Sequence, residues 1–236
     1  MNPYQKLQNR KRTWTPVQTT AGKLKDGAEE TIYRALAMRH MELPVGSFIQ
    51  DALSEIPALS ADLLKSNVKD EENHDLALGY IANALGVDET AEAEAKRLRD
   101  AWQAHPDHTV LKALVAERAI FFVLLPFFRF NGDAGLRTVS ADISRDEQVH
   151  VAANSLVCRE LGLSISPSLD KLRKATINWV MTPLKASTDK YLDKKFWLDA
   201  SDRLMYEGKA PELSDTKRAR MPAFFEHANP NLPQYA

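Results

Sequence analysis

The stretch Glu71-Glu72-Asn73-His74 has a counterpart in Glu147-Gln148-Val149-His150, so the chain carries two Glu-x-x-His tetrads. Residues i and i+3 of an α-helix project from the same side, and each tetrad can therefore offer one carboxylate and one imidazole to the same point. A single glutamate precedes each tetrad at nearly the same interval. Glu42 lies 29 positions before the first tetrad, and Glu117 lies 30 positions before the second. This spacing predicts a metal site built from two similar halves.

The positions of the turns support this interpretation. Where two antiparallel helices share a site, the turn between them should fall midway between their ligands. The midpoint of positions 42 and 71 falls at Ile56-Pro57, and that of positions 117 and 147 falls at Gly132; both lie in turn-forming sequence. A glutamate from each of two helices and a Glu-x-x-His from each of two others is the ligand set of ferritin-like dimetal bundles. The predicted ligands are Glu42, Glu71, His74, Glu117, Glu147 and His150.

The surroundings of these glutamates differ in what they indicate. Glu71, taken alone, could be an ordinary solvated helix charge, because Asp70, Glu72 and Asp75 surround it. Glu117 is followed by the apolar residues 119–125, and a carboxylate in such a stretch needs a partner once it is buried. A pair of metal ions would supply that partner.

The periodicity along the chain predicts an all-α fold: a ferritin-like four-helix bundle with additional helices and a flexible C-terminal tail. Residues 1–221 are expected to form a single dimetal domain, in which residues 1–24 are a polar N-terminal extension over the surface. The prolines of residues 222–236 predict the tail. Pro44, two residues after Glu42, predicts a kink or bulge beside the site. The expected helices span residues 28–55, 60–85, 88–104, 108–130, 135–161, 168–186 and 189–207.

The charge, hydropathy and cysteine content of the chain argue against several classes of protein. The 236 residues carry a formal net charge of −1, which gives no reason to expect nucleic-acid binding. No stretch is apolar for long enough to span a membrane, and the N-terminus lacks the apolar region of a signal peptide, so we expect a cytoplasmic protein. Cys158 is the only cysteine, which excludes an internal disulfide and any dithiol chemistry by one copy of this chain.

Several short segments resemble, in chain order, those of the radical-generating small subunit of class I ribonucleotide reductase. The Ser-Arg-Asp-Glu-x-x-His segment is similar to that family's Arg-Asp-Glu-x-x-His motif, and the Trp-Thr-Pro segment is similar to a Trp-x-Pro whose tryptophan hydrogen-bonds the aspartate of that motif. Aldehyde-deformylating oxygenases carry a string similar to the first motif, so it is the combination of segments that favours the reductase. The segments are Trp14-Thr15-Pro16, Glu42-Leu43-Pro44-Val45-Gly46, Glu117-Arg118-Ala119-Ile120-Phe121-Phe122, Ser144-Arg145-Asp146-Glu147-Gln148-Val149-His150, Asp202-Arg203-Leu204-Met205 and Pro222-Ala223-Phe224-Phe225-Glu226.

The resemblance implies a division of labour between two proteins. Two transition-metal ions, Fe and/or Mn, would be activated by an oxidant, and a one-electron hole would pass through Trp14 and Asp146 to a C-terminal tyrosine, here Tyr235. Nucleotide reduction itself would take place on a separate large subunit, since this chain has one cysteine and no Gly-rich phosphate loop. A homodimer is the expected state of the small subunit.

Two departures leave alternatives open. The family's radical tyrosine would lie four residues after His74, and this position is Leu78; Tyr80 lies at a different helical phase, which leaves Tyr33 or the metal pair to hold the oxidising equivalent. The interval of 46 residues from Glu71 to Glu117 is also closer to that of small dimetal oxygenases. The alternatives are therefore a ferritin-like iron-storage protein and a stand-alone oxygenase with an apolar pocket formed by Phe121, Phe122, Phe127 and Phe128.

Overall fold

The computed structural model describes residues 1–213, and in these residues all regular elements are helical apart from one isolated bridge between Lys185 and Asp193. The all-α prediction is confirmed. The expected tail of residues 222–236, with Phe224, Phe225, Glu226 and Tyr235, lies outside the described residues. No helix in residues 1–213 is long and apolar enough to cross a membrane. The elements are α1 (Pro3–Gln8), α2 (Glu29–Ala37), η1 (Met38–Met41), α3 (Glu42–Ala52), η2 (Ala58–Ser60), α4 (Ala61–Leu85), α5 (Glu89–Ala104), α6 (Thr109–Ala116), η3 (Glu117–Phe121), α7 (Phe122–Asn131), α8 (Ala134–Glu160), α9 (Pro167–Met181), η4 (Lys190–Leu192) and α10 (Lys194–Glu207).

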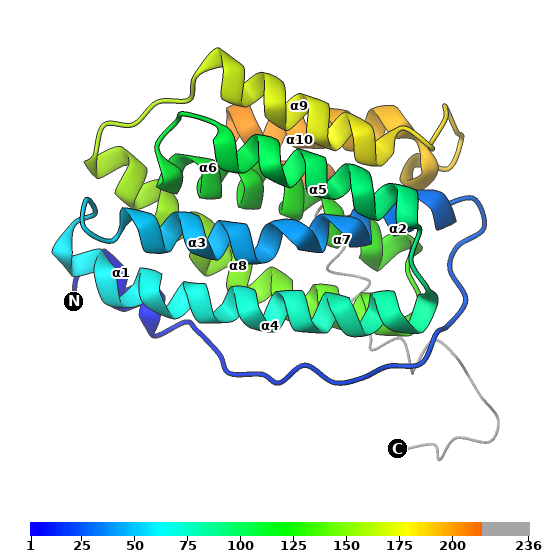
Figure 1. The fold of residues 1–236 in the computed structure, drawn as a ribbon, viewed down its shortest axis with the longest axis horizontal. Helices are drawn as coiled ribbons and strands as arrows, with labels where there is room; N and C mark the ends of the chain where they lie inside the picture. The colour runs from blue at the N-terminus through cyan, green and yellow to red at the C-terminus, as the bar shows by residue number, and fades with distance from the viewer. Residues whose placement is uncertain (214–236) are drawn as a thin grey trace.

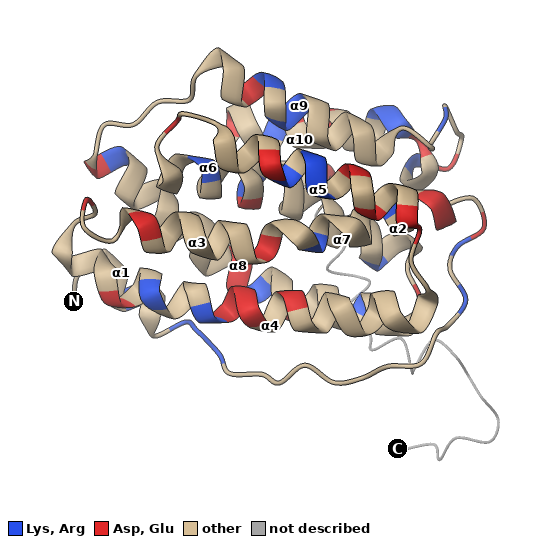
Figure 2. Ribbon diagram, in the orientation of Figure 1, with Lys and Arg blue, Asp and Glu red and all other residues tan. Residues whose placement is uncertain are grey.

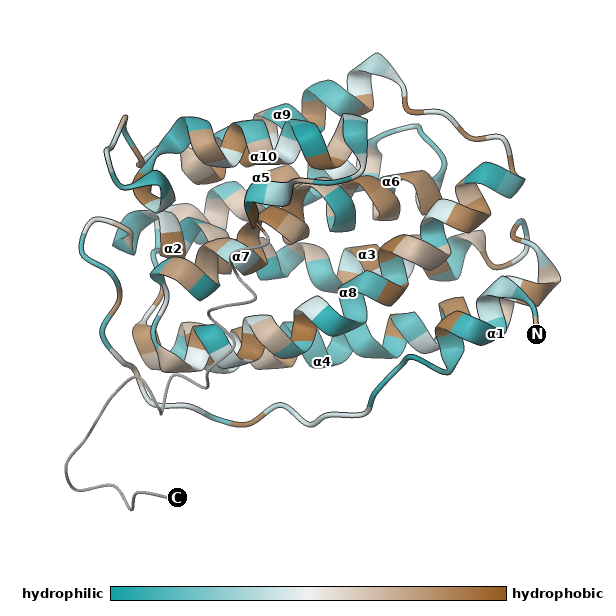
Figure 3. Cartoon of the chain, turned by 180° about the vertical axis from the view of Figure 1, so that it is seen from behind, coloured by the Kyte–Doolittle hydropathy of each residue, from teal (hydrophilic) through white to brown (hydrophobic). Residues whose placement is uncertain are grey.

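Four helical segments form the centre of the molecule. Helices α3 and α4 make one hairpin, and the continuous segment α6–η3–α7 makes a second hairpin with α8 (Figure 1). Helix α3 packs on α4 and α6, and α8 packs on α4, α6 and α7. The first turn contains Pro57 and the second contains Gly132, so both predicted turn positions are confirmed. Helices α6 and α7 are largely hydrophobic, in keeping with their central place (Figure 3).

The turn between α7 and α8 shows why these helices end where they do. The Asp133 side chain caps α8 by accepting a hydrogen bond from the Leu136 backbone N–H at 2.9 Å. The backbone N–H of Gly132 donates to the Phe128 carbonyl at 2.8 Å, and a Cβ at position 132 would lie only 2.5 Å from that oxygen. Glycine is therefore required at this position by close backbone approach.

Helices α5, α9 and α10 cover the central segments on one side. Helices α9 and α10 pack on each other, α10 packs on η3, and α5 packs on α2 and α9. The fully buried indole N–H of Trp102, on α5, donates to Thr176 Oγ1 on α9 at 3.0 Å. Helix α9 ends at Met181 and the next segment begins with the short turn η4, so the expected helices at 168–186 and 189–207 were drawn too long.

The N-terminal extension differs in part from the expectation. Residues 3–8 form α1, in which Tyr4 and Leu7 are buried and the Tyr4 hydroxyl donates to Glu160 at 2.8 Å. Residues 9–24, which we call the strap, then run without regular structure along α4 and α8 to the start of α2 (Figure 1). A Cβ at Gly135 would lie 2.9 Å from Thr19 Oγ1, so the strap approaches α8 closely.

Two irregular turns adjoin the site, and the one beside Glu42 agrees with the predicted irregularity although Pro44 does not lie in it. Pro44 falls in the first turn of α3, where a missing N–H leaves no bond unmade, and the irregular turn η1 lies before Glu42 rather than after it. The second is η3, a wide π-type turn that begins at Glu117 and was not predicted. Pro126 lies within α7 soon after η3. Wide turns of this kind often occur at functional sites.

Candidate metal centre

The six predicted ligands meet between the four central segments. Glu42 is the first residue of α3, and Glu117 is the first residue of η3. The two tetrads lie on α4 and α8, with acidic residues of α3, α4 and α8 at the same level midway along the helices (Figure 2). None of the six is more than 2% exposed, although four are carboxylic acids.

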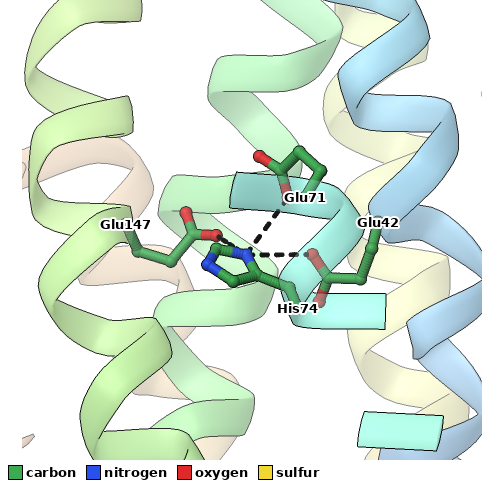
Figure 4. Close-up of side chains that lie close together, drawn as sticks. All are labelled: Glu42, Glu71, His74 and Glu147. Atoms are coloured by element: carbon green, nitrogen blue, oxygen red, sulfur yellow. Dashed lines mark hydrogen bonds and ion pairs between the residues drawn. The ribbon is translucent and has the colours of Figure 1, made fainter. Parts of the chain in front are cut away.

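The six residues form two groups that share one glutamate. In the first group, His74 Nδ1 lies 3.2 Å from Glu71, 3.4 Å from Glu147 and 3.7 Å from Glu42 (Figure 4). In the second, His150 Nδ1 lies 3.0 Å from Glu71 and 3.9 Å from Glu117. One potential ligand atom from each member of a group lies within 4.8 Å of all the others. Each group could therefore hold a metal ion.

The hydrogen bonding of these carboxylates fits a bound cation. Glu42 Oε2 and both carboxylate oxygens of Glu147 are buried and lack a hydrogen bond of normal geometry. Buried carboxylate oxygens are costly unless a donor or a cation satisfies them. A cation held by Glu42 and Glu147 would give these carboxylates the partner that they lack. The residues present thus fit a metal site with mixed carboxylate and imidazole donors.

Burial and the charges of neighbouring groups shift the pKa values of all six side chains when no metal is present. Burial raises the pKa of Glu42, Glu117 and Glu147, and it outweighs the opposing effect of the nearby imidazoles. For Glu71, burial is opposed more strongly by the two histidines, which hold its pKa below the usual range. The metal-free centre is therefore expected to retain protons that metal ions would displace.

Carboxylates also raise the pKa of both imidazoles. Burial alone would lower the pKa of His74, but hydrogen bonds to the carboxylates around it raise that pKa well above its usual value. The pKa of His150 is raised well above its usual value in the same way, chiefly by the charge of Glu71 against the effect of burial. Both imidazoles are therefore expected to be protonated at neutral pH in the metal-free protein.

An aspartate contacts the Nε2 atom of each imidazole, on the side away from the other ligands. The sequence did not predict either contact. His74 Nε2 lies 3.3 Å from Asp146 Oδ2, and His150 Nε2 lies 2.9 Å from Asp70 Oδ2. An ionised carboxylate can only accept, so Nε2 of each ring carries a proton, and Nδ1 of each ring faces the other ligands. We call Asp70 and Asp146 the backing carboxylates. Each precedes the glutamate of one tetrad and supports the histidine of the other, so the repeated Asp-Glu-x-x-His was the signal that could have revealed them.

The strap reaches both backing carboxylates. The Trp14 indole N–H donates to Asp146 Oδ2 at 2.7 Å, and its ring stacks near His74 with a centroid distance of 6.2 Å. The hydrogen bond that the resemblance implied for Trp14 and Asp146 is therefore present. Lys11 Nζ lies 2.5 Å from Asp70 Oδ2, a contact that the sequence did not indicate.

The turn that carries Glu117 is fixed by groups from three helices. Asn154, on α8, donates to Glu117 Oε2 at 2.7 Å. The Ser201 hydroxyl, on α10, donates to the Ala119 carbonyl of η3 at 2.6 Å and accepts from the buried Arg173 guanidinium at 2.8 Å. Arg173 also pairs with Asp202 at 2.7 Å, which gives the Asp202-Arg203-Leu204 segment a structural role.

The other sequence-predicted residues lie away from the ligands or in the core. Leu78 is buried, whereas Tyr33 and Tyr80 are half-buried and, within residues 1–213, make no hydrogen bond or ring contact with the six ligands. Phe127 is fully buried with an edge-to-face contact to Trp197 at a centroid distance of 5.2 Å, and Phe121 and Phe128 are also buried. No protein-family model, curated protein or solved structure matches the chain.

Proposed function

We propose that the chain is the compact small subunit of a class I ribonucleotide reductase, a ferritin-like protein that generates an oxidising equivalent for a separate large subunit. One observation carries the proposal: the six-residue centre is connected to the strap by the hydrogen-bonded series His74, Asp146 and Trp14, at 3.3 and 2.7 Å. Ordinary metal storage gives no reason for an oxidisable indole at the end of such a series.

Glu42, Glu71, His74, Glu117, Glu147 and His150 would hold the two metal ions, Fe and/or Mn. Bound there, such ions supply one-electron redox chemistry with O₂ or a related oxidant, which zinc does not. The protein contributes shielding from water, since all six side chains are buried. It also fixes the direction of the imidazoles through the backing carboxylates.

Trp14 is suited to carry the hole away from the centre. Its indole is half-buried and hydrogen-bonded to Asp146, so one end of the ring meets the site while part of it remains exposed. Asp146 accepts the hydrogen bond from the indole N–H and so holds the ring in place beside His74. Under this proposal the hole leaves the centre by this path toward Tyr235.

The single cysteine supports a division of the reaction between two proteins. Cys158 is 5% exposed, and burial, aided by the charge of Glu117, raises the pKa of its thiol to about 12. It therefore stays a neutral, enclosed thiol at physiological pH and cannot act as an external reductant. Reduction of a nucleotide would need thiols supplied by the large subunit, and a homodimer of the present chain stays part of the proposal.

The decisive experiment combines the metal-loaded protein with class I large subunits and measures deoxynucleotide formation. We expect two Fe or Mn ions per chain and turnover only in the mixture. Deleting residues 229–236 should abolish turnover with metal content unchanged, and Tyr235→Phe should do the same while binding to the large subunit persists. Oxidation of a small apolar substrate by the protein alone would instead support the oxygenase alternative.

A further inference from the structure

Each histidine of the centre contacts a backing carboxylate, and each backing carboxylate contacts a residue of the strap. The two strap residues differ in their chemistry. His74 is backed by Asp146, which accepts a hydrogen bond from Trp14, and His150 is backed by Asp70, which is paired with Lys11. Both outer groups come from the strap, three positions apart. An indole can be oxidised and an alkylammonium cannot, so the His150 arm offers no exit for a hole.

The Lys11 ammonium occupies a complete binding site on α4. Its nitrogen lies 2.5 Å from Asp70 Oδ2 and donates to Ser66 Oγ at 2.8 Å and to Asn67 Oδ1 at 3.0 Å. An ammonium has three N–H donors, and these three acceptors account for all of them. The Lys11 side chain is only 10% exposed, unlike a typical surface lysine.

We propose that Lys11 is a positioning residue for the half of the centre formed by Glu71, Glu117 and His150. Ser66, Asn67 and Asp70 lie within about one turn of a single rigid helix. The ammonium therefore fixes the Asp70 carboxylate, whose second contact is His150 Nε2 at 2.9 Å. Asp70 in turn fixes the direction in which His150 Nδ1 points. This inference rests on the dimetal centre of the proposed function and adds a residue outside its six ligands.

Charge gives a second reason why a lysine is needed here. The four ligand carboxylates and Asp146 lie in the interior, and Asp70, whose side chain is 14% exposed, lies beside them against His150. Lys11 places a positive charge beside Asp70 in a poorly hydrated position, where charge-assisted hydrogen bonds are stronger than at the surface. A neutral side chain of similar length would leave Asp70 with His150 and without its charged partner, free to turn away.

The test counts metal ions rather than turnover. Metal-free wild type, Lys11→Met and Lys6→Met are titrated with Mn²⁺, and free Mn²⁺ is measured by electron paramagnetic resonance. Lys6 is an exposed lysine of α1, so Lys6→Met controls for the loss of one positive charge nearby. We expect two ions in wild type and in Lys6→Met. In Lys11→Met, affinity for one of the two ions should fall by about tenfold or more, as for other groups that orient metal ligands.

A double-mutant cycle separates positioning from general destabilisation. If Lys11 acts through His150, Lys11→Met should change Mn²⁺ binding very little in a His150→Ala background. Lys11→Cys followed by aminoethylation restores an ammonium at nearly the same reach, and buried Cys158 should be spared; this treatment should return the lost affinity. Thermal unfolding of each metal-free variant confirms that it is folded.

Three results would overturn the inference, and they are distinguishable. Wild-type binding of both ions by Lys11→Met would remove Lys11 from the centre and leave the proposed function standing. Equal weakening of both ions, unaffected by the His150→Ala background and not restored by aminoethylation, would show that Lys11 has only a general structural role. A wild-type protein that binds no Mn²⁺, Fe²⁺ or other divalent ion would refute the dimetal centre and this inference together.

Discussion

Glu147 illustrates how the centre departs from ordinary protein chemistry at the scale of single residues. Its carboxylate is fully buried, and neither oxygen has a hydrogen bond of normal geometry, although Oε1 lies 3.4 Å from His74 Nδ1. Folding around such a group is unfavourable unless it is protonated or meets a cation. The proton and the metal ion are thus alternative occupants of the same site, which makes stability depend on pH.

We predict that the metal-free protein becomes less stable as pH rises. The pKa values of Glu42, Glu117 and both histidines lie above their usual 4.5 and 6.5 in the folded state. The native state then binds more protons than the unfolded state once the pH rises to the usual pKa values, 4.5 for the glutamates and 6.5 for the histidines, and each extra proton lowers the free energy of unfolding by about 1.4 kcal/mol per pH unit. Thermal melting of chelator-treated protein at several pH values measures this slope.

A matched variant identifies the groups responsible. In Glu42→Gln/Glu117→Gln, two glutamates are replaced by neutral side chains of the same shape, and the slope should become smaller. Metal addition should reverse its sign, since bound ions displace the protons and binding strengthens with pH. Stability of the metal-free protein that rises over this range would show that the carboxyls are ionised in the native state.

At the scale of elements, the wide turn η3 is the feature that the sequence did not reveal. The two hairpin turns were predictable because Pro57 and Gly132 act locally, and the six ligands were predictable because their spacing repeats. A π-type turn is different, since it changes which backbone groups pair without requiring a particular side-chain pattern. The support of Ala119 by Ser201 joins residues 82 positions apart and could be found only in three dimensions.

We predict that Ser201→Ala loosens this turn. The Ala119 carbonyl and the Arg173 guanidinium would each lose a buried partner, at a cost of about 1–3 kcal/mol in the free energy of unfolding. Because Glu117 begins the same turn, metal affinity should fall as well. Urea unfolding and Mn²⁺ titration measure the two effects. Thr182→Ala, which removes an exposed hydroxyl bonded to its own helix, is the control and should change neither.

At the scale of the whole molecule, the two hairpins give an approximately duplicated centre, and the strap makes its two halves different. The hairpins contribute a backing carboxylate each, in equivalent positions before Glu71 and Glu147. The strap supplies an indole to one carboxylate and an ammonium to the other. Under the proposed function, an oxidising equivalent would have a single direction of exit, although the ligand set itself is nearly symmetric.

Two truncated proteins should distinguish the contribution of the strap to metal binding from that of α1, the helix before it. Removing residues 1–8 deletes α1 and the burial of Tyr4 and Leu7, which should cost about 1.5–3 kcal/mol of stability for each side chain but leave both metal ions bound. Removing residues 1–24 also deletes Lys11 and Trp14, so both backing carboxylates lose their partners. We expect this protein to stay helical by circular dichroism, because the helices from α2 onward retain their own contacts, and to bind both ions more weakly by Mn²⁺ titration. Equal metal affinity in the two truncated proteins would show that the central helices orient the histidines without the strap, which would contradict the positioning role of Lys11.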